Sequence, residues 1–454
     1  MADLHAEPMA VAAATQAPVG RAGLRTYYVL LGAQAVSLLG SQISGLAVSI
    51  AVFRQTGHAT PLALVACFLA APRIVLGGLA GALADRVDRR RIMLAANLGY
   101  VVASGLLLAS FASGAFRLWH LYALVLVGAT CAAIEAPAFQ ASVTMLVPDG
   151  HRDRANAIGM LTGPAAGVLA PTLAGLLYAI IGVVGAISLD LATFAVAIVA
   201  LVVVRIPMPH RTDEGRATQA SIWREAFDGF RYLGARPALL GLCGCFSVMN
   251  FLVLGVLVLD VPYILDRTGN VAVLGLVMGA LNLGAVAGAV TMALWGGTRP
   301  RIHTVMLAAA MIGVFLALAG VSRGAVSIGA SLFLLMFATP FIEAAAFSIL
   351  QAKIAPDLQG RVFAAVGQIT ALLRPAAYLL VGPLADSVFE PARRLPLWRR
   401  VAWFVGSGQG AGIGLMFVIS GTLALLLILA VYGVPAIRRM EATLPDQGAA
   451  AEPA

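Results

Sequence analysis

Ile134-Glu135-Ala136-Pro137-Ala138-Phe139 lies inside a long apolar run, and a near copy, Ile342-Glu343-Ala344-Ala345-Ala346-Phe347, follows 208 positions later. Two further matches have almost the same offset: Pro148-Asp149 with Pro356-Asp357, and Gly77 and Gly81 with Gly284 and Gly288. Matches that share one offset indicate an internal duplication, and membrane transporters are often built from two such parallel halves. The sequence therefore predicts two pseudo-symmetric halves.

The composition places both halves in a membrane. Of the 454 residues, 60% are hydrophobic and 11% are charged, whereas soluble domains contain about 25% charged residues. A transmembrane helix needs about 20 apolar residues. Twelve runs meet this need: 27–53, 61–84, 92–113, 119–147, 155–181, 183–204, 238–259, 271–294, 302–321, 325–354, 362–388 and 411–437. We therefore expect an all-α integral membrane protein with 12 transmembrane helices in two pseudo-symmetric six-helix bundles.

Polar stretches divide the chain into five expected parts. These are a disordered N-terminal segment (1–24), an N-terminal six-helix bundle (25–204), a cytoplasmic linker (205–237), a C-terminal six-helix bundle (238–437) and a disordered tail (438–454). Within the linker, apolar residues recur at helical spacing opposite charged ones, which predicts an amphipathic helix that lies on the membrane surface or packs on the bundles. The apolar residues are Ile222, Trp223, Ala226, Phe227, Phe230 and Leu233.

The basic residues decide the expected topology. If both termini are cytoplasmic, 20 of the 30 Lys and Arg residues lie on the cytoplasmic side and 8 lie outside. Because positive charge collects in cytoplasmic loops, we expect a multi-pass protein of the plasma (inner) membrane with both termini in the cytoplasm. This topology accounts for the formal charge of +9, so we expect membrane lipids, and no nucleic acid, as partners.

The sequence lacks the signals of an enzyme. Twelve spans leave about 200 residues, and because the loops and tails take up these residues, no room is left for a separate catalytic domain. The only lysine, Lys353, has no glycine before it, so the chain contains no P-loop. The six His and four Cys residues show no metal-ligand spacing. We therefore predict no enzyme activity, no metal and no cofactor.

The end of the second run reads Gly81-Ala82-Leu83-Ala84-Asp85-Arg86-Val87-Asp88-Arg89-Arg90-Arg91. It resembles the signature loop between helices two and three of the major facilitator superfamily, with Asp88 where the family usually has Gly. The segments 359–363 and 382–391 resemble the drug:proton antiporter branch, which holds macrolide efflux proteins and the enterobactin exporter. The resemblance implies a gating motif made of Gly81, Asp85, Arg86, Arg89 and Arg90, with Asp85 near the start of the eleventh helix, whose N-terminal dipole favours an anion.

Glu135 and Glu343 are the candidates for proton coupling. Ionisable groups in hydrocarbon are costly, so those that persist are functional candidates. The resemblance implies that the fourth and tenth helices line the central cavity. Apolar surroundings disfavour a carboxylate, so each Glu can take up and release a proton. A fixed pairing with a buried Arg and direct substrate contact remain alternatives.

The two glutamates are expected to have different roles. Pro137 can kink the fourth helix beside Glu135, and the tenth has Ala345 at that place. We therefore expect Glu135 to be the main proton carrier and Glu343 to set the substrate charge preference.

Arg73 and Arg374 lie about half way along their runs. The resemblance implies that the second and eleventh helices meet at the seam between the halves, which places these arginines near each other. Two close arginines need an anion, and the Glu pair, a lipid phosphate or an acidic substrate can supply it. Asn250 and Asn282 are further candidates for the substrate cavity, with bonding to backbone carbonyls as the alternative.

Two other features have a structural interpretation. Asp190 and Asp260 lie nearer the outer ends of their spans, where we expect capping or interfacial roles. Three pairs of glycines spaced four apart allow close helix packing or sliding between the halves: Gly77/Gly81, Gly163/Gly167 and Gly284/Gly288.

These observations together predict a proton-coupled secondary exporter of a small amphipathic molecule, such as a drug, a macrolide or a siderophore-like compound. It is expected to work as a monomer by alternating access, with the transmembrane proton gradient as its energy source. An importer or lipid transporter of the same fold is the first alternative. A membrane-embedded enzyme or sensor is the second, but it needs a catalytic cluster or a sizeable soluble domain, and the sequence has neither.

Overall fold

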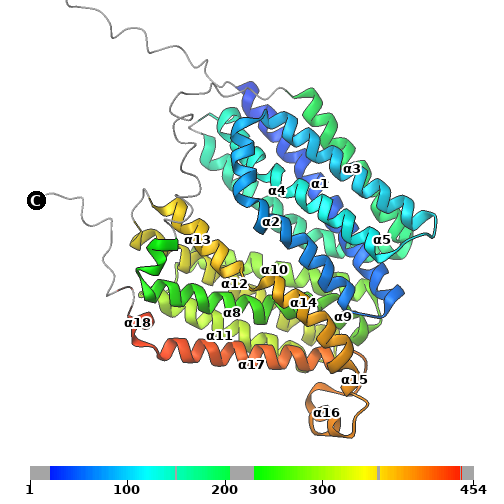
Figure 1. The fold of residues 1–454 in the computed structure, drawn as a ribbon, viewed down its shortest axis with the longest axis vertical. Coiled ribbons are helices and arrows are strands. Elements are labelled where there is room, and N and C mark those ends of the chain that lie inside the picture. Colours follow the sequence, from blue (N-terminus) through cyan, green and yellow to red (C-terminus); the bar gives the residue numbers. More distant parts are fainter. Residues whose placement is uncertain (1–20, 149–150, 205–229, 355–357, 440, 442–454) are drawn as a thin grey trace, which may run out of the picture.

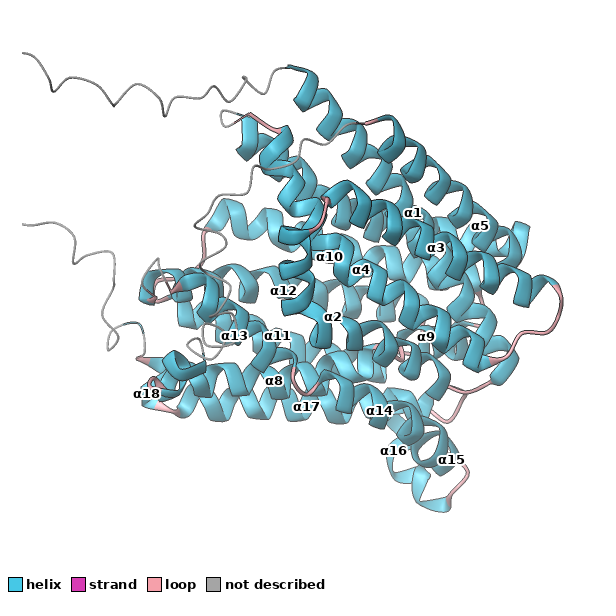
Figure 2. Ribbon diagram, turned by 45° about the horizontal axis from the view of Figure 1, so that its top comes forward, coloured by secondary structure: helices cyan, strands magenta, loops and turns pink. Residues whose placement is uncertain are grey.

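The computed structural model describes residues 21–148, 151–204, 230–354, 358–439 and 441, and in these residues it contains helices and no strand (Figure 2). The first half comprises α1 (Arg21–Thr56), α2 (Thr60–Arg86), α3 (Arg89–Ala112), α4 (Leu118–Leu146) and α5 (Arg152–Val203). The second half comprises α8 (Pro237–Leu257), α9 (Asp260–Thr268), α10 (Val271–Trp295), α11 (Arg301–Val321), α12 (Ala325–Lys353), α13 (Gln359–Ala371), α14 (Arg374–Leu384), η3 (Ala385–Phe389), α15 (Glu390–Ala392), η4 (Pro396–Trp398), α16 (Arg399–Val405), α17 (Ala411–Gly433) and α18 (Pro435–Arg438).

The helices confirm the expected twelve-helix fold. Ten of the described helices are long and apolar enough to cross a membrane, and a shorter apolar helix, Thr60–Leu76, lies in α2. One of the ten, Ile158–Val203, holds two spans that join at Gly182 without a loop. Gly182 has φ 64° and ψ −169°, a conformation that only glycine adopts readily, so it reverses the chain there.

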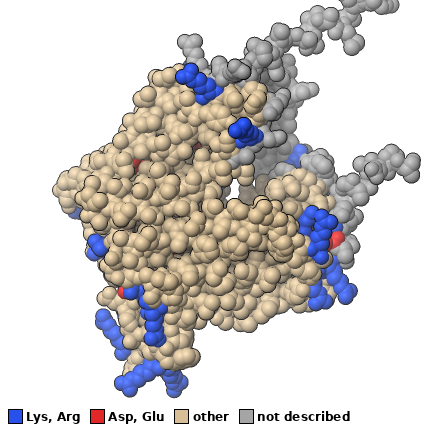
Figure 3. Space-filling view, turned by 180° about the vertical axis from the view of Figure 1, so that it is seen from behind, with Lys and Arg blue, Asp and Glu red and all other residues tan. Residues whose placement is uncertain are grey.

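The two halves meet at one end of the molecule. We name the ends by the connections that they hold: the α1–α2 end contains residues 57–59, and the α2–α3 end contains residues 87–88. The halves contact each other through α2 with α14 and α5 with α10, and in Figure 1 they come together near α9 and α14. Toward the α2–α3 end they diverge, and Figure 3 shows an opening between them on that side.

Glycine makes the contact between α5 and α10 possible. A Cβ on Gly175 would lie 2.9 Å from the carbonyl oxygen of Val271, and one on Gly275 would lie 2.6 Å from that of Pro171. Both distances are too short for a real side chain. The halves therefore touch backbone to backbone near the α1–α2 end.

The other glycine pairs differ in what they contact. Gly284 and Gly288 pack against the backbone of Phe333 and Phe337 on α12, so this pair joins two helices of the same half and is not a sliding surface between halves. Gly167 faces Asn282 of the other half. The surroundings of Gly77 and Gly81 lie outside the described residues.

Two segment boundaries need correction. α1 begins at Arg21, so residues 21–24 are helical and not disordered. In the expected tail, Glu441 accepts a hydrogen bond from the backbone N–H of Arg301 at 2.7 Å, and its carbonyl accepts one from Lys353 Nζ at 2.6 Å. These contacts hold the start of the tail against α11 and α12. The predicted amphipathic helix lies outside the described residues, apart from the helical residues 230–234.

Candidate transport site

Glu135 lies in a polar layer between α1, α3 and α4. Its side chain is 8% exposed, and its Oε1 accepts hydrogen bonds from Gln34 Nε2 and Asn97 Nδ2, each at 2.8 Å. The Tyr100 hydroxyl faces the same carboxyl group. These donors are neutral, and no ion pair joins Glu135 to a described basic residue, so the layer can hold the carboxyl group with or without its proton.

Glu343 has different surroundings. It is an exposed residue of α12, and no hydrogen bond or ion pair links its side chain to another described residue. Pro137 does not distinguish the two helices, because α12 also contains a proline, Pro340, three residues before Glu343. The two glutamates therefore differ in burial and partners, while both of their helices contain a proline near the carboxyl group.

The two seam arginines have separate neighbours. Arg73 is an exposed residue of α2 that lies close enough to Tyr100 to act on it electrostatically. Arg374 begins α14, its Nε is buried without a hydrogen bond among the described residues, and it lies near Tyr378. Tyr378 in turn lies near Cys67 of α2. The contact of α2 with α14 agrees with the expected seam, while Arg73 acts electrostatically on Tyr100, a neighbour of Glu135.

Both asparagine candidates bond to backbone carbonyls. Asn250 on α8 donates to the carbonyl oxygen of Thr370 on α13 at 2.8 Å. Asn282 donates to that of Met278 on its own helix at 2.9 Å. A Cβ on Gly167 would lie 2.6 Å from the Asn282 side chain, so Asn282 also packs between α5 and α10. Each amide thus has a structural contact in this conformation.

Two described residues of the motif loop, Asp88 and Arg90, contact the start of α3 and the end of α5. The side chains of Gly81, Asp85 and Arg86 lie outside the described residues, and Arg89 begins α3. Asp88, at the position where the family usually has Gly, caps α3 by accepting from Arg90 N at 2.9 Å. Arg90 donates to the carbonyl oxygens of Leu201 and Val202 at 2.8 and 2.6 Å. It therefore ties α3 to the C-terminal end of α5, where a cation is favoured.

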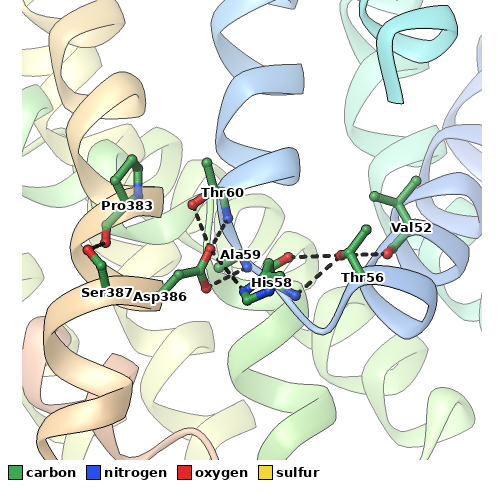
Figure 4. A network of polar contacts seen from close by, with 8 residues as sticks. All are labelled: Val52, Thr56, His58, Ala59, Thr60, Pro383, Asp386 and Ser387. Atoms are coloured by element: carbon green, nitrogen blue, oxygen red, sulfur yellow. Dashed lines mark hydrogen bonds and ion pairs between the residues drawn. The ribbon is translucent and has the colours of Figure 1, made fainter. Parts of the chain in front are cut away.

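A contact between the halves that sequence reasoning missed lies at the α1–α2 end (Figure 4). Asp386 on η3 accepts hydrogen bonds from the backbone N–H groups of Ala59 and Thr60, both at 2.8 Å, and from the Thr60 hydroxyl at 2.5 Å. His58 Nδ1 lies 3.9 Å from the same carboxylate. A Cβ on Gly382 would lie 2.6 Å from Thr60 Cα, so η3 and α14 approach the start of α2 closely.

Asp190 is not the capping or interfacial group that the sequence suggested. It is 4% exposed and accepts hydrogen bonds from Ser41 of α1 at 2.8 Å and Ser104 of α3 at 3.2 Å. Its position along the span did not indicate the face of the helix on which it lies. Asp260 does lie at a helix start, where it begins α9 and accepts from Val261 N at 2.6 Å.

Sequence comparison relates the chain to bacterial drug efflux proteins. The chain is 23% identical over 418 residues to macrolide efflux protein A of Streptococcus pyogenes, covering 91% of this chain and 97% of that protein. It is 25% identical over 361 residues to the multidrug efflux pump Tap of Mycolicibacterium fortuitum, covering 77% and 86%. These similarities confirm the predicted resemblance to drug efflux proteins.

Solved structures and a family model agree on the fold. A bacterial homologue of the human lysosomal transporter Spinster, in an inward-facing and unoccupied conformation, superposes with a TM-score of 0.69 at 14% identity, covering 90% of this chain and 96% of that one. The family model of the Major Facilitator Superfamily matches residues 30–378. The family consists of transporters, which confirms the prediction of a membrane transporter and not an enzyme. On this evidence the chain is a multi-pass membrane protein that belongs to the Major Facilitator Superfamily.

Proposed function

We propose that this protein is a proton-coupled exporter of a small amphipathic molecule of the drug or macrolide class. The observation that carries the proposal is the Glu135 layer, in which a buried carboxyl group has only neutral partners among the described residues. Such a group changes its charge by binding a proton more readily than one that is fixed in an ion pair. The efflux proteins named above support export as the direction.

We further propose that the α2–α3 end faces the cytoplasm, as the distribution of Arg residues suggests. In this orientation the opening between the halves faces inward, while the contacts of Asp386 with Thr60 and of Gly175 with Gly275 close the outer side. Alternating access then requires the outer contacts to break and the inner ends to approach each other. Proton binding at Glu135 and substrate binding compete to bias these two states.

Inside-out membrane vesicles from an efflux-deficient host provide the test. Uptake of radiolabelled erythromycin, and separately of ethidium, is measured after lactate energises the membrane. We expect uptake that a protonophore abolishes while the ATP concentration is held constant, and that replacement of sodium by choline leaves unchanged. Uptake that resists the protonophore would refute proton coupling, and loss of uptake in choline would indicate sodium coupling instead.

The direction of transport needs a separate measurement, because the fold alone does not decide between export and import. Right-side-out vesicles preloaded with the same compounds are energised in parallel. An exporter depletes the preloaded compound faster than vesicles without the protein do. Accumulation from the outside in these vesicles would support an importer.

A further inference from the structure

A second buried carboxylate repeats the surroundings of Glu135 in the same half of the protein. Asp190, on the second span of α5, receives one hydroxyl from α1 and one from α3. Glu135, on α4, receives one amide from α1 and one from α3. Each layer therefore combines a carboxyl group with neutral side chains from the same two helices, and the Glu135 layer has Tyr100 of α3 in addition.

The two layers are in register on these helices. Ser41 follows Gln34 by seven residues on α1, and Ser104 follows Asn97 by seven residues on α3. Seven residues make nearly two helical turns and a rise of about 10 Å, so each pair of side chains points in the same direction. The layers are thus stacked along the bundle with Asp190 nearer the α1–α2 end.

Polar side chains also occupy the level between the layers. Ser37 of α1 lies one turn from both Gln34 and Ser41, is 5% exposed, and makes no hydrogen bond to a described residue.

Tyr100 occupies the same level on α3. It lies between Asn97 and Ser104 and faces Glu135. The Tyr100 ring stacks on Phe194, one turn after Asp190, with ring centroids 5.1 Å apart.

No described basic residue contacts Asp190, whose partners are the two hydroxyl groups. The titratable groups that face the stack lie around the Glu135 layer: Tyr100 on α3, Cys131 on α4 and, at longer range, Arg73 on α2. A hydroxyl group can donate or accept a hydrogen bond. The Asp190 layer can therefore hold both the carboxylate and the protonated acid without rearranging its helices.

We propose that Asp190 is the outer station of a proton path to Glu135. This inference rests on the proposed proton-coupled function and its orientation, in which Asp190 lies eight residues, about 12 Å, from the outer turn at Gly182. A proton from outside binds one Asp190 oxygen. It then passes along the hydroxyl groups of Ser104, Ser37 and Tyr100, together with entering water, to the Glu135 carboxylate. Glu135 becomes the neutral acid, and Asp190 returns to the carboxylate.

Infrared spectroscopy of the purified full-length protein tests this path without a substrate. After a jump to lower pH, the carbonyl band of protonated carboxyl groups is followed in time, and Glu135→Gln identifies the component that belongs to Glu135. We expect Asp190→Asn to remove a second component and to slow the rise of the Glu135 component about tenfold or more. The control Asp260→Asn removes a carboxyl group from the other half and should leave that rise unchanged.

A second variant covers the case in which Asp190→Asn fails to fold. Ser41→Ala combined with Ser104→Ala keeps the carboxyl group but removes its hydroxyl partners, and it should also slow the Glu135 component. An unchanged rate in either folded variant would overturn the path. Erythromycin transport driven by a pH gradient in proteoliposomes is measured in parallel. If the native protein shows none, the proposed function fails, whereas the infrared result still decides the proton path.

Discussion

The Asp386 carboxylate binds both the backbone N–H and the hydroxyl group of Thr60, although the two residues belong to opposite halves of the protein. The contact caps the first turn of α2, because N–H groups at a helix start lack partners within the helix. In most proteins the capping residue precedes its own helix. Here the cap comes from the other half of the protein, and the proposed alternating access requires this contact to break.

We expect Asp386→Ala to shift the protein toward the state that is open at the α1–α2 end. Loss of an N-cap costs about 1 kcal/mol, or about fivefold in the ratio of two states. Spin labels on Ala115 and Val326, one in each half, would report the shift as a longer distance in pulsed electron paramagnetic resonance.

Two control variants should keep the native distance distribution. Asp386→Asn can still cap the helix. Ser387→Ala removes a hydroxyl group that bonds to Pro383 within its own helix. If Asp386→Ala shows the native distribution, the cap is not a gate.

Glu135 and Glu343 are expected to respond differently to the same substitution. Glu135→Gln should abolish gradient-driven efflux but retain substrate binding and exchange, because the amide keeps the shape of the layer without binding a proton. Glu343→Gln should keep coupling and weaken the binding of cationic substrates more than that of neutral ones. Proton flux in proteoliposomes under an imposed pH gradient distinguishes them. Normal coupled flux in Glu135→Gln would refute its assignment, and equal losses would favour a shared two-carboxylate site.

Arg90 and Arg91 provide a matched pair of adjacent basic residues. Arg90→Ala removes two charge-assisted hydrogen bonds to the end of α5, which we expect to destabilise the protein by about 1 kcal/mol. Arg91 is 80% exposed and lies 3.8 Å from Asp88, so Arg91→Ala should have little effect. Thermal unfolding in detergent should show a lower Tm for Arg90→Ala alone. Equal Tm values for the two variants would argue against a structural role for Arg90.

Asp85→Asn should leave the protein folded and inserted but slow its turnover. The reason is that the proposed gating role of the motif concerns the balance between two open states, and such states typically differ by about a few kcal/mol. Membrane insertion, Tm and the transport rate are measured together. A variant that fails to insert, or that transports at the native rate, would exclude the gating role of Asp85.

The sequence predicted the parts of the fold that depend on hydrophobicity and repetition. Apolar run length is enough to place spans, and three matches at nearly one offset, including that of Glu135 with Glu343, divide the chain into halves. It did not predict the helix breaks at residues 258–259 and 372–373 or the π-helical turn η3, because these depend on packing between neighbours and not on local composition.

The candidate site was predicted in part for a related reason. Glu135 is conspicuous because charge in an apolar run is costly, but its partners Gln34 and Asn97 come from other helices. Asp190 was assigned to the interface because position in a span gives depth alone. Asp386 was overlooked because its partner, Thr60, lies 326 positions away, and no local pattern signals a cap from so distant a residue.

The backbone contact between Gly175 and Gly275 also has a consequence for genetics. Neither residue has a side chain to offer a ligand, so a screen for substrate recognition would overlook both. Yet any other amino acid at either position would act as a wedge between the two halves. In a saturation-mutagenesis library selected for antibiotic survival, we expect both codons to remain glycine as strictly as the codon of Glu135 remains glutamate.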